Sequence, residues 1–255
     1  MTETSRLGRS PRLLAKELTK AAARDGFALL RDVDLTRDEF GTFVHSIGEL
    51  SSHRFGSGEA GLLELDASPR PDRIVTGRSA LPLHTDGTLV GASPKFIVLY
   101  CYAVDQMPGS GCTEICLQSE LLGERTPPEF KELVAGEWEY FVTDTSHFPD
   151  VANRWLSIPT TMTAADESVR LNIALPFDAA DKTTGWQVRL PGLTDDDSRP
   201  VLSRLDRYLR QSPSYYAHEW TQGDLLVLDN ELVLHGRTRI EPNSVRHLLR
   251  GQISG

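Results

Sequence analysis

The stretch Gly223-Asp224-Leu225-Leu226-Val227-Leu228-Asp229-Asn230, followed shortly by His235-Gly236-Arg237, is the most informative part of the chain for its fold. A Gly-Asp turn that leads into four aliphatic residues is typical of a short, fully buried strand. Similar apolar runs, separated by Gly, Pro, Asp and Ser, occur at residues 62–65, 96–104, 113–117, 169–175 and 247–253. This succession predicts a sandwich or jelly roll rather than alternating βαβ units.

Helical patterns precede and interrupt these strands. Residues 13–23 carry apolar side chains at helical spacing, Gly26 ends that pattern, and residues 27–30 are expected to form a short strand. Thr36 precedes an acidic turn and is a suitable N-cap for a second helix that runs to about residue 47. A further amphipathic helix is expected at residues 200–209, with the acidic residues just before it as its solvated start.

The composition is that of an ordinary globular protein. With 255 residues, 39% hydrophobic and 25% charged, and with no repeat or long linker, we expect a single domain over residues 1–255. In it, residues 1–60 form a helical and strand wrapper and residues 61–255 form the jelly-roll core with a helical insert. The net charge of −9 argues against a nucleic-acid backbone or an anionic membrane as partner. The longest apolar run is too short to span a bilayer, and the polar start lacks a signal-peptide core.

The cysteines are informative about the cellular compartment, and no catalytic or metal-binding role is expected for them. Cys101, Cys112 and Cys116 are odd in number and form no C-x-x-C motif, so buried apolar packing or chance exposure is expected for all three, and not a role as nucleophile or ligand. Unpaired cysteines are typical of a reducing environment, which predicts a cytoplasmic protein.

The candidate chemistry begins at Leu83-His84-Thr85-Asp86-Gly87, because the chain has no Gly-rich phosphate loop and no G-x-S-x-G motif. If this segment is a strand, His84 and Asp86 share one face and present an imidazole and a carboxylate to the same point. They would supply two of the three ligands of a 2-His-1-carboxylate site for non-haem Fe(II). Taken alone, the triplet is more simply interpreted as a turn in which Asp86 caps backbone N–H groups.

Two arginines near the end of the chain also require an explanation. In Val245-Arg246-His247-Leu248-Leu249-Arg250, a strand places Arg246, Leu248 and Arg250 on one face. If that face is inward, each guanidinium needs an anionic partner, because an unpaired buried charge is very costly. A carboxylate fits the guanidinium bidentately. The two arginines lie about 13 Å apart along a strand, so they can serve different anions or opposite ends of one small ligand cluster.

Taken together, these pieces resemble a known family. The motif H-T-D at residues 84–86, D-N-x-x-x-x-H-G-R at residues 229–237 and arginines at positions 246 and 250 are similar to the taurine dioxygenase family of Fe(II)/2-oxoglutarate-dependent oxygenases. The resemblance is ordered across most of the chain. One departure is Cys112, which stands where the family has an aspartate.

The resemblance implies the roles of individual residues. His84, Asp86 and His235 match the iron ligands. Arg246 matches the arginine that holds the distal carboxylate of 2-oxoglutarate, and Thr113 is the expected hydroxyl partner of that carboxylate. The implied fold is α+β, with a double-stranded β-helix (jelly-roll, cupin-like) core and flanking helices.

The same resemblance suggests a substrate subsite. Arg250 matches a position that binds the anionic head of the substrate in taurine dioxygenase itself, and His53 resembles the other substrate-binding position there. The alternative for His53 is an exposed loop histidine. For Arg250 it is a second contact to the cosubstrate or to Asp86. The other histidines, His45, His147, His218 and His247, are interpreted as structural or surface residues.

The implied activity is hydroxylation of an unactivated C–H bond in a small polar, anionic metabolite or biosynthetic intermediate, with Fe(II) and 2-oxoglutarate as cofactors. Desaturation, epoxidation or cyclisation would use the same oxidant. Two other classes stay open: a non-catalytic jelly-roll binding module, and a zinc hydrolase with the same ligands, which would leave Arg246 and Thr113 without an anion to hold. The expected partners are a small-molecule substrate and O₂, without nucleic acid or membrane, and homo-oligomer formation is left open.

Overall fold

The computed structural model describes residues 10–51, 61–67, 74, 77–105, 107–164, 166–180 and 184–254 of the chain. The helices are α1 (Pro11–Asp25), α2 (Arg37–Ile47), α3 (Ser119–Leu122), α4 (Pro128–Leu133) and α5 (Asp195–Arg210). The strands are β1 (Phe27–Leu30), β2 (Leu63–Asp66), β3 (Leu81–His84), β4 (Phe96–Val104), β5 (Thr113–Leu117), β6 (Glu137–Val142), β7 (Leu156–Pro159), β8 (Thr161–Thr163), β9 (Val169–Leu171), β10 (Trp186–Arg189), β11 (Tyr216–His218), β12 (Leu225–Asp229), β13 (Val233–Arg237) and β14 (Arg246–Ile253).

The larger sheet has five strands in the order β1-β12-β4-β14-β2, and all its pairings are antiparallel. Strand β12 lies between β1 and β4, so that Leu228 is opposite both Phe27 and Ile97. An internal strand that is covered on both faces needs apolar residues at every position, which explains the continuous run of aliphatic residues in β12.

The second sheet has four antiparallel strands in the order β11-β5-β13-β3. Its register places His235 of β13 directly opposite His84 of β3. Gly236 permits this close pairing, because a Cβ at that position would lie 2.7 Å from the carbonyl oxygen of Leu81. The two histidines are thus brought together by strand pairing between segments that are far apart in the sequence.

The two sheets face each other across a shared apolar core. Residues of the larger sheet such as Leu226 and Leu248 pack with Ile115 and Val233 of the smaller one. Because side chains alternate along a strand, residues two positions from these core residues also point between the sheets, and residues next to them point to the outer face. His235 shares the inward face of Val233, whereas the adjacent Leu234 belongs to the core on the other side of the sheet.

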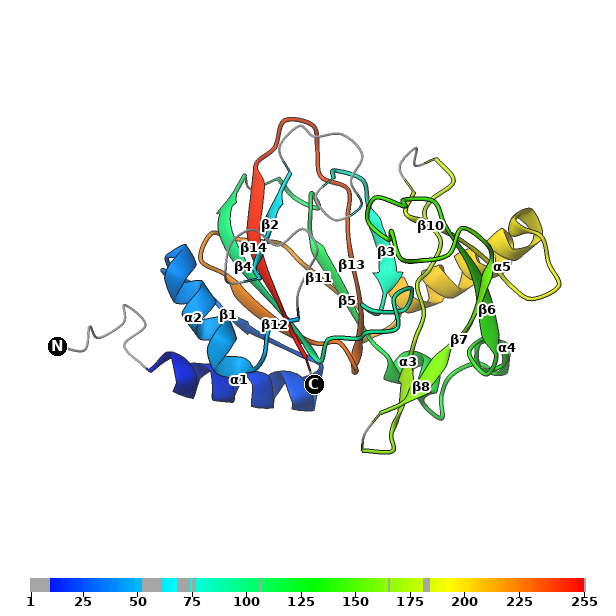
Figure 1. The fold of residues 1–255 in the computed structure, drawn as a ribbon, viewed down its shortest axis with the longest axis horizontal. Coiled ribbons are helices and arrows are strands. Elements are labelled where there is room, and N and C mark those ends of the chain that lie inside the picture. The colour runs from blue at the N-terminus through cyan, green and yellow to red at the C-terminus, as the bar shows by residue number, and fades with distance from the viewer. Residues whose placement is uncertain are drawn as a thin grey trace.

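Further layers cover both sheets on the outside. Helices α1 and α2 pack on the outer face of the five-stranded sheet through a core that includes Phe40, Phe43 and Val98. A three-stranded sheet, β10-β6-β7, and helix α5 cover the outer face of the four-stranded sheet. Figure 1 shows these two coverings at opposite ends of the molecule, with the paired sheets between them.

The N-terminal elements confirm the predictions from sequence. Helix α1 ends at Gly26, whose φ is 89°, and β1 has the predicted bounds. Helix α2 starts after Thr36, which forms a capping box with Glu39: the Thr36 hydroxyl accepts the Glu39 N–H at 3.2 Å, and the Glu39 carboxylate accepts the Thr36 N–H at 2.8 Å. Two N–H groups that lack a partner within the helix are satisfied in this way.

Other boundaries differ from the predictions. Helix α5 begins at Asp195 instead of at residue 200, because Thr194 caps it and the acidic residues form its first turn. The strand expected over residues 169–175 ends at Leu171. Strand β3 ends at His84, so Asp86 lies in the turn that follows and not on the strand. In that turn, hydrogen bonds with a side chain replace strand pairing.

The three cysteines are buried, which is one of the two expected alternatives. Burial raises the pKa of the Cys101 thiol to about 12, so that this group stays protonated and packs as an apolar side chain. In the part of the chain that the structure describes, no helix has the length and apolar character needed to cross a membrane.

Candidate active site

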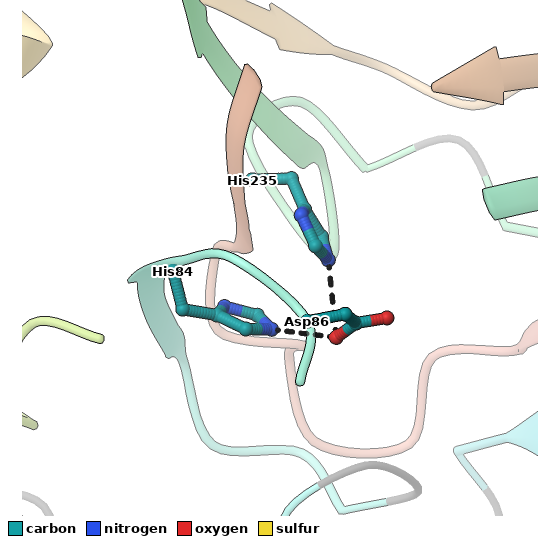
Figure 2. Close-up of side chains that lie close together, drawn as sticks. All are labelled: His84, Asp86 and His235. Carbon is teal, nitrogen blue, oxygen red and sulfur yellow. Dashed lines mark hydrogen bonds and ion pairs between the residues drawn. The ribbon is translucent and has the colours of Figure 1, made fainter. Parts of the chain in front are cut away.

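His84, Asp86 and His235 converge between the two sheets. The rings of His84 and His235 lie 4.3 Å apart between centroids. The Nε2 atom of His84 is 3.2 Å from Asp86 Oδ1, and the Nε2 atom of His235 is 3.6 Å from the same oxygen. All three donor atoms lie within 4.8 Å of one another. Figure 2 shows both imidazoles directed at one end of the Asp86 carboxylate.

The contacts around this cluster leave the converging atoms available for a metal ion. The Nδ1 of His84 is 2.9 Å from the carbonyl oxygen of Pro82 and must donate to it, so the lone pair is on Nε2, which faces the centre. A backbone or carboxylate partner of this kind is the usual device that orients a metal-binding histidine. The donor set itself is the 2-His-1-carboxylate set that suits non-haem Fe(II). The residues present therefore fit such an ion.

The charges in the site also suit a metal centre. Burial raises the pKa of Asp86, but the Arg250 cation and the close contacts with His235 and His84 outweigh burial and hold the pKa well below its usual range. Burial and the neighbouring His84 lower the pKa of His235 to about 4 despite the Asp86 carboxylate. At neutral pH the site therefore offers an ionised carboxylate and, at His235, a neutral imidazole.

Asp86 reaches the cluster from a turn because Asn230 holds that turn in place. The Asp86 N–H donates to Asn230 Oδ1 at 2.9 Å, and Asn230 Nδ2 donates to the Asp86 carbonyl at 3.1 Å. The shared strand face expected for His84 and Asp86 was therefore wrong, and hydrogen bonds from a distant residue take its place.

Arg246 lies deep on the inward face of β14. The pairing of β14 with β4 shifts by one residue between His247 and Leu248, in a bulge. The alternation of side chains along β14 is kept, so Arg246, Leu248 and Arg250 all point between the sheets. The Nε of Arg246 donates to the carbonyl oxygen of Gly111 at 2.8 Å. Burial, together with the nearby Arg237, lowers the pKa of Arg246 to about 9. Among the residues that the structure describes, no carboxylate forms an ion pair with it.

Thr113 lies on the neighbouring strand β5 and is buried. Its hydroxyl oxygen accepts a hydrogen bond from the indole Nε1 of Trp220 at 3.1 Å. The hydroxyl proton must then point elsewhere, which makes it available to a second acceptor. A buried arginine without a carboxylate partner and a hydroxyl with a free proton are what an incoming dicarboxylate such as 2-oxoglutarate requires.

Of the two residues predicted to bind substrate, Arg250 is described and His53 lies outside the described residues. The Nη2 of Arg250 is hydrogen-bonded to Asp86 Oδ2, which is one of the two alternatives that the sequence left open for it. Arg250 also lines a cavity beside the cluster, so its predicted contact with a substrate stays a prediction.

This cavity has a volume of about 500 Å³ and opens next to His84 and Asp86. One wall is the loop after Asp86. The lining also includes His147 and Phe148, from the segment between β6 and β7, and Trp186 from β10. The Trp186 ring lies 6.0 Å from the His84 ring and its indole N–H donates to the Leu175 carbonyl at 3.0 Å, so it is held at the site.

The aromatic wall was not predicted from the sequence. His147 was interpreted as a structural or surface residue, whereas it lines the cavity, and no role was predicted for Phe148 and Trp186. Neither motif nor spacing could identify them, because they come from a separate sheet that packs against the site. Arg237, the last residue of the D-N-x-x-x-x-H-G-R motif, is buried and donates to the carbonyl of Ser79 at 2.8 Å.

The paired antiparallel sheets and the site between them define a dioxygenase that depends on Fe(II) and 2-oxoglutarate. The chain belongs to the Taurine catabolism dioxygenase TauD, TfdA family, whose model matches residues 5–252. Loaded with its cofactors, the enzyme is an oxidoreductase that acts with O₂ on a small molecule.

Two curated relatives come from isonitrile chemistry. The 3-((Z)-2-isocyanoethenyl)-1H-indole synthase of Fischerella ambigua (strain UTEX 1903) is 28% identical over 229 residues, which are 89% of this chain and 80% of the relative. The tyrosine isonitrile desaturase of Erwinia amylovora (strain CFBP1430) is 28% identical over 227 residues, 86% of this chain and 73% of the relative.

Solved structures show the same fold. The PvcB protein of Pseudomonas aeruginosa superposes with a TM-score of 0.70 at 21% identity, over 96% of this chain and 81% of that protein. AAD-2, solved with Mn(II) and N-oxalylglycine, also gives a TM-score of 0.70, at 16% identity over 97% of this chain and 90% of that protein. Both likenesses concern the architecture of helices and antiparallel sheets.

Proposed function

We propose that His84, Asp86 and His235 hold the iron, and that Arg246 and Thr113 bind the distal carboxylate of 2-oxoglutarate. When bound, iron and 2-oxoglutarate supply the oxidising power that breaks a C–H bond with O₂. The protein's own residues bind the metal and the cosubstrate, orient them and shield them. Pro82 fixes the ring of His84, Arg246 and Thr113 offer a cation and a hydroxyl proton, and the apolar cavity wall excludes water. The convergence of the three donor atoms is the observation that carries this proposal.

The contact between Trp220 and Thr113 yields a first prediction. Trp220→Phe removes the hydrogen bond that directs the hydroxyl proton of Thr113 toward the cosubstrate. We expect the KM for 2-oxoglutarate to rise about fivefold, since one hydrogen bond is worth about 1 kcal/mol. Trp138→Phe is the matched control, because that indole donates to the Leu133 carbonyl far from the site. Equal KM values in both variants would contradict the role of Trp220.

The glycine beside Arg246 yields a second prediction. Gly111 has a φ of 63°, and a Cβ there would lie 2.7 Å from Arg246 Cδ. Gly111→Ala should destabilise the fold by about 1–2 kcal/mol and displace Arg246, which weakens binding of 2-oxoglutarate. Gly109→Ala separates the two effects, because Gly109 also has a positive φ, 74°, but no atom lies within 4 Å of the position that its Cβ would take. Denaturant unfolding and the KM for 2-oxoglutarate are the measurements, and an unchanged KM in Gly111→Ala speaks against the placement of Arg246.

For the substrate, we propose an isonitrile that carries an aromatic ring, and for the reaction its desaturation. Support comes from the two curated relatives, one a tyrosine isonitrile desaturase and one the synthase of an indole that bears an isocyanoethenyl chain. The cavity agrees with this substrate class, since Phe148 and Trp186 offer aromatic faces to a ring and Arg250 offers a cation to a carboxylate. Hydroxylation, the outcome expected from the sequence, stays a prediction.

One assay separates these outcomes. The enzyme is incubated with Fe(II), 2-oxoglutarate, O₂ and the isonitriles derived from tyrosine and tryptophan, and the products are analysed by mass spectrometry with succinate as the second readout. Loss of two hydrogens with matching succinate supports desaturation, whereas gain of one oxygen supports hydroxylation. No substrate-dependent succinate with either compound refutes the substrate class. No succinate with any small anionic metabolite would favour a binding module.

Some further predictions accompany this function. We propose that the two facing sheets form a double-stranded β-helix, that residues 1–255 are one domain, and that the enzyme acts in the cytoplasm. The unpaired Arg246 favours an anionic cosubstrate over a zinc hydrolase, for which such a buried cation has no use. Metal analysis of protein that is purified without oxygen tests the choice between iron and zinc.

A further inference from the structure

The main chain of Asp86 is held by an amide from another part of the molecule. Besides the two contacts of the Asn230 amide with the Asp86 backbone, Asn230 Nδ2 lies 2.9 Å from Ser93 Oγ and 3.0 Å from the Pro94 carbonyl oxygen, so its two N–H groups are shared among three acceptors. Asn230 is buried, so water cannot replace these bonds at low cost. The amide therefore joins the turn of Asp86, the loop that forms one cavity wall, and the turn between β12 and β13.

The two oxygens of the Asp86 carboxylate have different surroundings. Oδ1 faces the Nε2 atoms of His84 and His235, at 3.2 Å and 3.6 Å. Oδ2 accepts a hydrogen bond from Gln252 Nε2 at 2.8 Å and another from Arg250. Rotation of the carboxylate plane out of this orientation would break the bonds on Oδ2, so these contacts keep one oxygen on the side of the imidazoles.

We propose that Asn230 and Gln252 are positioning residues for the metal ligand Asp86. Asn230 fixes the main chain of the turn, and Gln252 bonds one carboxylate oxygen so that the carboxylate is held with its other oxygen toward the metal. Asn230 lies in the turn that connects β12 of the larger sheet to β13 of the smaller one, and His235 follows on β13, so this connection carries one ligand and secures another. This inference rests on the ligand set proposed above. Outer partners of metal ligands typically contribute about 10- to 100-fold to metal affinity.

The test measures metal affinity directly, with Co(II) titrated into the full chain in the absence of 2-oxoglutarate. Gln252→Met keeps the length of the side chain and removes the donor, and Asn230→Ala removes the amide. Each variant is expected to bind Co(II) about 10- to 100-fold more weakly than the wild type. Thermal unfolding without metal is recorded in parallel.

Gln118→Met is the matched control. Gln118 is a buried amide that donates to the main-chain oxygen of Asn230 at 3.1 Å and bonds the Leu171 N–H, and it has no hydrogen bond with Asp86. Its loss should lower the melting temperature and leave Co(II) affinity unchanged. If Asn230→Ala and Gln252→Met likewise lower the melting temperature and leave Co(II) affinity unchanged, the role of both residues is purely structural and the proposal is overturned.

The remaining outcomes are also distinguishable. If Asn230→Ala does not fold, the Co(II) affinity of Gln252→Met tests the positioning role by itself. Gln252 is only half-buried and its removal leaves the turn intact. His235→Ala reports on the ligand set: if it binds Co(II) as the wild type does, the set is wrong and the positioning role fails with it. If His235→Ala loses Co(II) while both positioning variants keep wild-type affinity, the ligand set stands and the positioning role alone is refuted.

Discussion

Substitution of His235 by alanine is expected to lower succinate formation from 2-oxoglutarate at least about 100-fold, because even the outer partners of metal ligands contribute up to that factor. His235 Nε2 lies 3.6 Å from the Asp86 oxygen on which the site converges. With its pKa lowered to about 4 by burial and by His84, the imidazole is neutral and keeps a lone pair for the metal over the whole range of a normal assay. Bound iron per chain and succinate release are the two measurements.

His247→Ala is the control for this experiment. His247 also belongs to the paired sheets, on β14, but it is half-buried and its Nε2 lies 3.8 Å from Glu64, away from the cluster. It should retain both iron and activity. Iron content that is unaffected in His235→Ala would show that another residue completes the metal centre.

The second large effect is expected at Arg246. Arg246→Met should raise the Kd for 2-oxoglutarate by about 30-fold or more, since loss of one partner from a buried charged pair costs about 2–5 kcal/mol. The same substitution should make the cofactor-free protein more stable, by about 1–4 kcal/mol, because a buried cation without a carboxylate partner is replaced by an apolar chain of similar volume. Burial, with the nearby Arg237, lowers the pKa of Arg246 to about 9, which agrees with such a cost.

Both effects must occur in one variant for this account of Arg246 to hold. Titration of 2-oxoglutarate gives the affinity, and thermal unfolding without cosubstrate gives the stability. Arg204→Met, at an exposed arginine of α5, controls for the loss of one positive charge and should change neither quantity. An Arg246→Met protein that binds 2-oxoglutarate normally would place the distal carboxylate elsewhere.

The elements that could be predicted are those whose burial follows a local pattern. Strands β1, β4 and β5 have the predicted bounds, and α2 begins after the expected Thr36 cap. Predictions were poorer for the three-stranded sheet that covers the four-stranded one. Strands β6, β7 and β10 were not predicted, although Trp138 and Tyr140 of β6 are fully buried, because their partners belong to α5 and the four-stranded sheet.

The candidate site likewise has a part that could be predicted from the sequence and a part that could not. The resemblance identified His84, Asp86 and His235, and the structure brings their donor atoms within 4.8 Å of one another. The expected reason, a common strand face, was wrong for Asp86, since β3 ends at His84. Side chains alternate with a period of two only while the strand continues, and here a hydrogen bond from Asn230 replaces the strand pairing.

The candidate metal-binding and anion-binding residues followed from the resemblance to a family, which rests on the whole ordered set of motifs. The amino-acid pattern by itself determined the alternation of buried strands and the caps of the first helices. These features depend on neighbours a few positions away, so they are legible in a linear pattern. The tertiary structure decided which oxygen of Asp86 faces the imidazoles, that Arg246 is left without a carboxylate among the described residues, and that Phe148 and Trp186 form a wall of the cavity. Those features depend on how separate sheets pack, and packing between distant segments leaves no periodic trace in any one of them.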